Sequence, residues 1–121
     1  MTKSELAERC QASPMLIDQY VRDGVIAPTW ITKLGRAGKT LDLHPMAAAA
    51  VVLMAMLGEA LGGNSPTPKR IVRALHQKIE VQWRNPEPTD LTVDQELESG
   101  EILQVTIRTR FIEKARQLVA A

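Results

Sequence analysis

The segment from Met46 to Leu61 constrains the fold more than any other part of this sequence. Only Gly58 and Glu59 interrupt a run of Ala, Val, Leu and Met residues. A helix that is apolar on every side is buried on several sides. The most apolar part of the run is shorter than the about 18–20 residues that a membrane-crossing helix needs. We therefore expect a central core helix, or one that completes the core of a dimer, and no membrane span.

The chain length of 121 residues suits one domain, or a small domain with an appendage. Aromatic residues make up only 3% of the chain, so the core must be built from aliphatic side chains. The single cysteine, Cys10, excludes an intramolecular disulfide framework and a cysteine-rich zinc site. The N-terminus has no apolar signal core. These features predict a soluble cytoplasmic protein. The net charge of +1 decides nothing about nucleic acid, because the distribution of charge matters more than its sum.

Two short helices are expected at the N-terminus. Thr2 and Glu5 have the spacing of a capping box, in which each side chain satisfies the backbone donor of the other residue. Ser13 followed by Pro14 starts a second helix, because serine is a good N-cap and proline suits the first helical position. Gly24 then provides a left-handed cap at the end of that helix. Two short helices joined by about three residues form a helix-turn-helix arrangement.

A small hairpin, or wing, is expected after Pro28. Residues 29–32 and 39–43 are the predicted strands, and the segment between them contains two glycines. His44 or Asp42 is expected to cap the apolar helix that follows. The tip of the hairpin carries three cations and no acid, namely Lys33, Arg36 and Lys39.

The rest of the chain is expected to form helices around a second hairpin. A fourth helix capped by Thr67 has an apolar face made of Ile71, Val72, Leu75 and Ile79. Strands at 91–93 and 102–107 join through 98–100, and an amphipathic helix at 110–119 closes the chain. The predicted fold class is therefore mainly α with small β elements. It is a winged helix-turn-helix followed by helices and a C-terminal β-hairpin plus helix.

The predicted organisation divides the chain into two regions. Residues 1–62 form the winged helix-turn-helix, and residues 63–121 form a helix, a hairpin and a closing helix for dimerisation or partner binding. Residues 64–78 are basic without any acid, whereas residues 80–101 hold seven acids and one arginine, and the final segment is again mainly basic. These blocks are either solvated faces, or a basic surface with an acidic counter-patch that discourages wrong contacts.

Several motifs occur in order in the first half of the chain. They are Ser4-Glu5-Leu6-Ala7, Ser13-Pro14, Ile17, Tyr20, Arg22, Gly24-Val25-Ile26, a glycine-bearing wing and Leu41-Asp42-Leu43 before a helix. Over about residues 2–60 this order resembles the MerR-type winged helix-turn-helix family. The resemblance implies a bacterial transcription regulator that binds DNA as a dimer. The second helix would lie in the major groove and the wing on the DNA backbone.

The sequence departs from this family at several positions. Met15 and Asp18 stand where the family usually carries basic residues, and Gln11 stands where its turn often has glycine. Asp18 would repel phosphate, although a carboxylate can accept a hydrogen bond from a cytosine amino group. The long dimerising helix of many members has no counterpart here. The main alternative is therefore a MerR-like protein-binding adaptor that does not bind DNA. The second alternative is a DNA-architectural or excision factor.

The predicted DNA contacts lie on the second helix and on the wing. Ser13 and the backbone donors after it suit a phosphate, because helix N-termini attract anions. Gln19 can pair with adenine, and Arg22 can reach a phosphate. Tyr20 lies on the apolar stripe, so core packing is its alternative role. Together with the wing cations, the predicted set is Ser13, Met15, Gln19, Tyr20, Arg22, Lys33, Arg36 and Lys39.

No catalytic, cofactor or metal site is expected. Gly38-Lys39-Thr40 lacks the earlier glycine of a phosphate-binding loop, and His44 and His76 have no ligand spacing around them. We therefore predict a sequence-specific DNA-binding transcription regulator of bacterial or phage type that is not an enzyme. Its expected partners are double-stranded DNA and a second copy of the chain. A protein partner that binds the C-terminal region is a further option.

Overall fold

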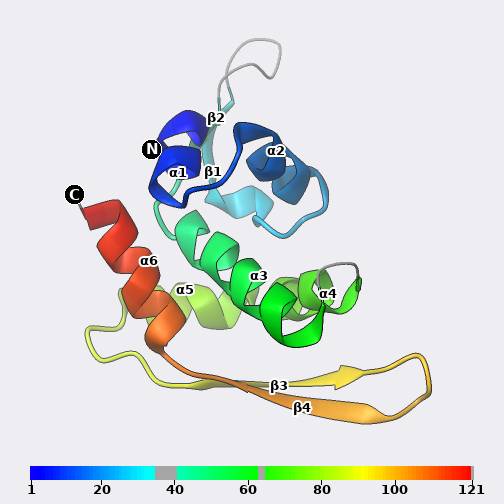
Figure 1. Cartoon of the computed structure of the whole chain (residues 1–121). Helices are drawn as coiled ribbons and strands as arrows, with labels where there is room; N and C mark the ends of the chain where they lie inside the picture. Colours follow the sequence, from blue (N-terminus) through cyan, green and yellow to red (C-terminus); the bar gives the residue numbers. More distant parts are fainter. Residues whose placement is uncertain (35–40, 63–64, 121) are drawn as a thin grey trace.

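The computed structural model describes residues 1–34, 41–62 and 65–120 of the chain. In this part of the chain, six α-helices, one 3-10 helix and four strands are present, and the strands form two small antiparallel sheets (Figure 1). The prediction of a mainly α chain with small β elements is confirmed. In chain order the elements are α1 (Lys3–Arg9), α2 (Pro14–Arg22), η1 (Pro28–Trp30), β1 (Ile31–Leu34), β2 (Leu41–Leu43), α3 (Ala47–Leu61), α4 (Thr67–Ala74), α5 (His76–Arg84), β3 (Leu91–Glu96), β4 (Ile102–Ile107) and α6 (Arg110–Ala120).

The two N-terminal helices form where the sequence predicts them. Thr2 Oγ1 accepts the backbone N–H of Glu5 at 3.1 Å. The Glu5 carboxylate accepts from the Thr2 hydroxyl and not from its backbone, so half of the predicted capping box forms. Ser13 Oγ caps α2 by accepting the N–H of Leu16 at 3.1 Å. Gly24 follows α2 with a φ of 74°, a conformation that glycine adopts at little cost.

The first hairpin begins later than predicted. Thr29 and Trp30 belong to the 3-10 helix η1, so their assignment to a strand is wrong, and β1 begins at Ile31. The reason is the tryptophan side chain, which is fully buried. The tight turn directs its indole into the core, where Nε1–H donates to Glu80 Oε1 at 2.7 Å. Beyond the turn, β1 pairs antiparallel with β2, with Ile31 opposite Leu43.

The N-terminus covers the outer edge of β2. Thr2 forms an isolated antiparallel bridge with Asp42. The backbone N–H of Leu43 donates to the carbonyl of Met1 at 2.7 Å. The first hairpin therefore has a backbone partner on the side of β2 that faces away from β1.

Helix α3 lies at the centre of the molecule, as its uniformly apolar sequence predicts. Residues 47–54 and Leu57 are all buried. The helix packs against both α4 and α6. His44 Nδ1 accepts the N–H of Met46 at 3.1 Å. The N-cap of α3 is Met46 and has no side-chain capping bond, so the predicted cap at His44 or Asp42 is wrong. The core cluster around α3 contains side chains from both halves of the chain.

The predicted fourth helix is in fact two helices, α4 and α5, which meet at Leu75. The predicted cap at Thr67 is also wrong, because Ser65 Oγ accepts the N–H of Thr67 at 3.2 Å. The break keeps Leu75 fully buried and brings His76 Nε2 to 2.8 Å from the carbonyl oxygen of Val25. This contact joins the start of α5 to the segment that follows α2.

The second hairpin lies at the opposite end of the molecule from the first (Figure 1). Its predicted strands are confirmed, and β3 is longer than expected, with Leu91 opposite Ile107 and Glu96 opposite Ile102. Helix α6 then returns along the body of the molecule. Arg116 Nη2 lies 2.9, 2.6 and 2.6 Å from three carbonyl oxygens at the end of α5, those of Gln82, Trp83 and Asn85, which share its two N–H donors.

Candidate nucleic-acid interface

Helix α2 presents three of the predicted contact residues in one exposed row. Met15, Gln19 and Arg22 follow one another at helical spacing, so they lie on the same side of α2, and all of them are exposed. The side chain of Met15 is 76% exposed. Ile17 points the other way and is fully buried, which anchors the helix. We call Met15, Gln19 and Arg22 the α2 row.

Ser13 stands at the N-terminal end of the α2 row. Its Oγ accepts from Leu16, and a serine hydroxyl that accepts one hydrogen bond can still donate its own proton. The N-terminus of a helix also favours an anion because of the unpaired backbone donors and the helix dipole. Gln11 has a φ of 54°, rarely adopted by residues other than glycine, and lies in the turn between α1 and α2. The N-terminal end of α2, at Ser13, therefore suits a phosphate oxygen.

The structure places Tyr20 on a different side of α2. Its ring is half-buried, and burial raises the pKa of its phenol. It lines a cavity of about 250 Å³ between α2, α3 and α6, together with Leu16, Met56, Glu59 and other side chains. Tyr20 is therefore turned toward the body of the molecule and is not part of the α2 row.

Two acids, Asp18 within α2 and Asp23 at its C-terminal cap, have cationic partners that the sequence analysis did not predict. Lys3 Nζ lies 3.0 Å from Asp18 Oδ1, with 42% of the Asp18 side chain exposed. Lys69 on α4 pairs with Asp23 directly after α2. The hydrogen bond from Lys69 holds the pKa of Asp23 below its ordinary value. These pairs reduce the negative potential beside the α2 row, and sequence spacing gave no sign of them.

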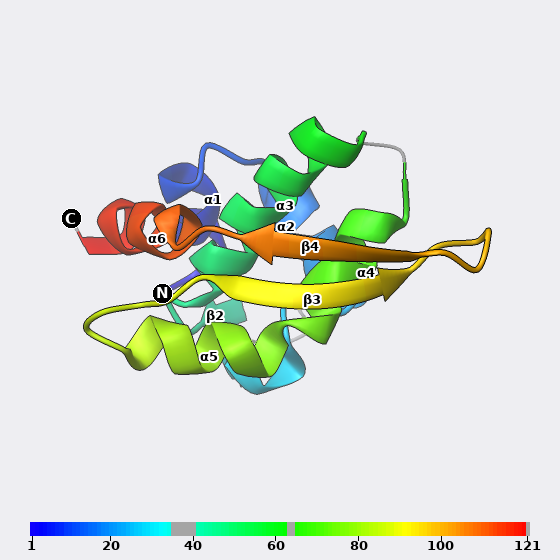
Figure 2. The same ribbon diagram turned by 90° about the horizontal axis from the view of Figure 1, so that it is seen from below.

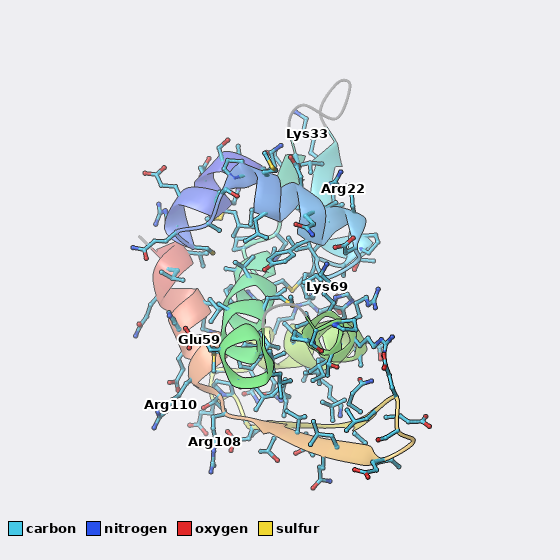
Figure 3. All side chains as sticks on the ribbon, turned by 45° about the vertical axis from the view of Figure 1, so that its right-hand side comes forward. Arg22, Lys33, Glu59, Lys69, Arg108 and Arg110 are labelled. Carbon is cyan, nitrogen blue, oxygen red and sulfur yellow. The ribbon has the colours of Figure 1, made fainter. Side chains whose placement is uncertain are left out.

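The first hairpin extends from the same end of the molecule. Figure 3 shows the labelled Arg22 and Lys33 at this end, and Arg108 and Arg110 at the other. Lys33 is exposed and lies opposite Asp42 in the hairpin. The other two predicted wing contacts, Arg36 and Lys39, lie outside the described residues. The described part of the predicted interface thus comprises Ser13, the α2 row and Lys33.

The described residues were also inspected for a reactive cysteine, a metal site and a membrane-spanning helix. Cys10 lines the cavity beside Tyr20, and burial raises the pKa of its thiol. Within the described residues no cluster of His, Cys, Asp and Glu could hold a metal ion. None of the helices in these ranges combines the length and apolarity needed to span a bilayer.

Comparisons with protein-family models, curated proteins and solved structures found no match to this chain.

Proposed function

We propose that this chain is a sequence-specific DNA-binding transcription regulator whose first region, residues 1–62, is a MerR-type winged helix-turn-helix. The observation that carries the proposal is the α2 row, an exposed stripe on a helix whose other side is anchored in the core. Helix α2 enters the major groove, and the first hairpin follows the DNA backbone. A two-fold dimer then presents two copies of α2 to half-sites about one helical turn apart.

Each residue of the interface has a distinct chemical role in this proposal. The Gln19 amide can form two hydrogen bonds to adenine, and Arg22 can bind guanine or a phosphate. Met15 can contact a thymine methyl group, which suits its exposed apolar side chain. Ser13 and Lys33 hold phosphates and fix the position of the helix without reading bases. The pairing of Asp18 with Lys3 reduces the repulsion of the DNA backbone.

The exposed Met15 also favours a second candidate function, a protein-binding adaptor. An apolar side chain that is 76% exposed in the first turn of a helix is a suitable anchor for a protein partner. Binding of this kind depends on apolar burial, so salt should change it little. DNA binding through several phosphates weakens steeply with salt.

The test is selection of bound fragments from a random double-stranded DNA pool, followed by binding measurements on the enriched sequence across a salt series. We expect one sequence to be enriched and its affinity to fall steeply with salt. Gln19→Ala should relax preference at one base pair by about 1–3 kcal/mol, and Arg22→Ala should weaken binding. Arg84→Ala, an exposed arginine at the end of α5, is the matched control and should bind like the wild type.

Absence of enrichment would contradict the proposal, as would wild-type binding by both Gln19→Ala and Arg22→Ala. The adaptor function predicts a different pattern. In that case a protein complex would persist at high salt, and Met15→Glu would abolish it while leaving the fold intact.

A further inference from the structure

The outer edge of β4 has no strand partner among the described residues. The second hairpin is a two-stranded sheet, so each of its strands has one edge that faces away from the other. Figure 2 shows β3 running beside α5, with β4 on the side away from that helix. A two-stranded hairpin is marginally stable by itself, and an open edge is a template for another strand.

The hydrogen-bonding pattern identifies the backbone groups on this edge. Leu97 N–H donates to the carbonyl of Glu101 at 2.8 Å, and bonded and non-bonded pairs alternate along an antiparallel ladder. Thr92 confirms the alternation on β3, because its carbonyl faces outward and accepts from Lys78 Nζ at 2.9 Å. On β4, the residues whose backbone groups point away from β3 are therefore Ile102, Gln104 and Thr106.

An apolar groove runs along the same strand. A cavity of about 300 Å³ separates β4 from the C-terminal half of α3, and Met56, Leu57 and Ala60 line its helix side. Val105 and Ile107 line its strand side. A strand added at the edge of β4 would place alternate side chains over this groove, because side chains alternate between the faces of a sheet.

Charge along β4 changes sign from one end to the other. Glu98 and Glu101 lie at the turn before the strand, and Arg108 and Arg110 lie at its C-terminal end. Arg108 pairs with Asp90 at 3.1 Å, whereas Arg110 is exposed at the start of α6. Two copies of β4 that run antiparallel bring the acidic end of each copy next to the basic end of the other. A parallel arrangement would place like charges together.

We infer that β4 of one chain pairs antiparallel with β4 of a second copy and joins the two hairpins into one four-stranded sheet. A two-fold axis perpendicular to the sheet keeps each side chain on its own face. Leu103, Val105 and Ile107 of both copies therefore share the face that carries the groove. This contact between the two β4 strands forms the dimer of the regulator proposed above, and the experiments that test it use no DNA.

The first test is sedimentation equilibrium of the full chain from low to high micromolar concentration. We expect a monomer–dimer equilibrium in the wild type. Gln104→Pro removes an outward N–H and leaves the bonds to β3 in place, so it should weaken dimerisation at least tenfold with an unchanged circular dichroism spectrum. A wild-type chain that stays monomeric throughout would overturn the inference and leave the edge for a strand of another protein. Wild-type dimerisation by a folded Gln104→Pro chain would also overturn it.

The second test uses cross-linking and charge exchange, which do not depend on tolerance of proline. Gln104 is the middle one of the three outward residues, and in a pairing centred on it this residue lies opposite its own copy. Gln104→Cys should therefore form an intermolecular disulfide on mild oxidation, because opposed residues in an antiparallel pair lie within disulfide reach. Thr92→Cys is the matched control on the same face of the sheet but on the covered strand, and it should not cross-link faster than the wild type. Equal cross-linking by both variants would overturn the inference.

Charge exchange tests the antiparallel direction. Glu98→Arg and Arg110→Glu should each weaken the dimer several-fold, and the double variant should recover most of the loss. Failure of the double variant to recover would overturn antiparallel pairing. The outcomes separate the two proposals, because a dimer that selects no DNA sequence contradicts only the proposed function. A monomer that selects one contradicts only the β4 contact.

Discussion

Two antiparallel hairpins at opposite ends of this molecule differ in both charge and edge protection (Figure 1). The first hairpin carries Lys33, and the sequence between its two strands contains Arg36 and Lys39. Its β2 edge is covered by the N-terminus, through the bridge from Thr2. The second hairpin has an acidic tip and a β4 edge without a strand partner among the described residues.

The difference shows that a hairpin's surroundings decide what it can bind. A basic hairpin whose edge is already paired can offer side chains to an anionic surface without offering its backbone. A hairpin with one uncovered edge offers backbone donors and acceptors, and a strand is the partner that matches them. Like charge keeps the two acidic tips from meeting, which leaves antiparallel pairing along β4 as the favoured arrangement.

The largest expected effect comes from removing the anchor of the first hairpin. Trp30→Ala deletes a fully buried indole that donates to Glu80 and packs edge-on to His76, with ring centroids 4.9 Å apart. We expect a loss of about 3–5 kcal/mol in the free energy of unfolding. Val105→Ala in the half-buried second hairpin should cost about 1 kcal/mol. Chemical denaturation of both variants measures the contrast, and equal losses would show that the hairpins are anchored alike.

A smaller effect is expected from reversing charge on each hairpin. Lys33→Glu should weaken DNA binding across sequences and reduce the slope of log affinity against log salt by about one unit. Glu96→Lys adds a cation at the opposite end, on β3 and away from the β4 edge, and should leave DNA binding unchanged. Binding titrations over a salt series compare the two variants. An equal response to both changes would mean that net charge, and not the first hairpin, governs DNA affinity.

The smallest effect concerns pH at the base of the first hairpin. Burial lowers the pKa of His44 below its ordinary value of 6.5, and the positive charges of Arg84 and the N-terminus act in the same direction. The unfolded chain therefore binds this proton more readily than the folded chain does. The contribution to stability is full above pH 6.5 and is lost as the pH falls below it. Protonation would also remove the Nδ1 acceptor of the Met46 N–H.

Denaturation at several pH values measures this effect against His44→Asn, which keeps a side-chain acceptor but does not titrate. We expect the wild type to lose more stability than the variant on acidification through this range. Parallel pH profiles for the two proteins would show that His44 contributes nothing to the pH dependence.

Local chemistry made much of the fold predictable. Ser13 caps α2 and Gly24 adopts positive φ because these properties belong to single residues and their neighbours. The same holds for the buried α3 and for the two strands of the second hairpin, which follow from apolar composition and alternation. Within the predicted interface, the spacing of Met15, Gln19 and Arg22 was enough to place them on one side of a helix.

Contacts between distant segments decided the rest. The indole of Trp30 needs Glu80, and the break at Leu75 accompanies a contact from His76 to Val25, so neither could be found by inspecting a window of sequence. Whether Asp18 repels DNA depends on Lys3, and which hairpin edge is open depends on where the N-terminus and α5 pack. The sequence by itself determined where α1 and α2 begin, which faces are apolar and where charges cluster, because these depend on neighbouring residues. Only the tertiary structure decided which charges are neutralised and which backbone edge stays open, because these depend on groups that folding brings together from far apart in the chain.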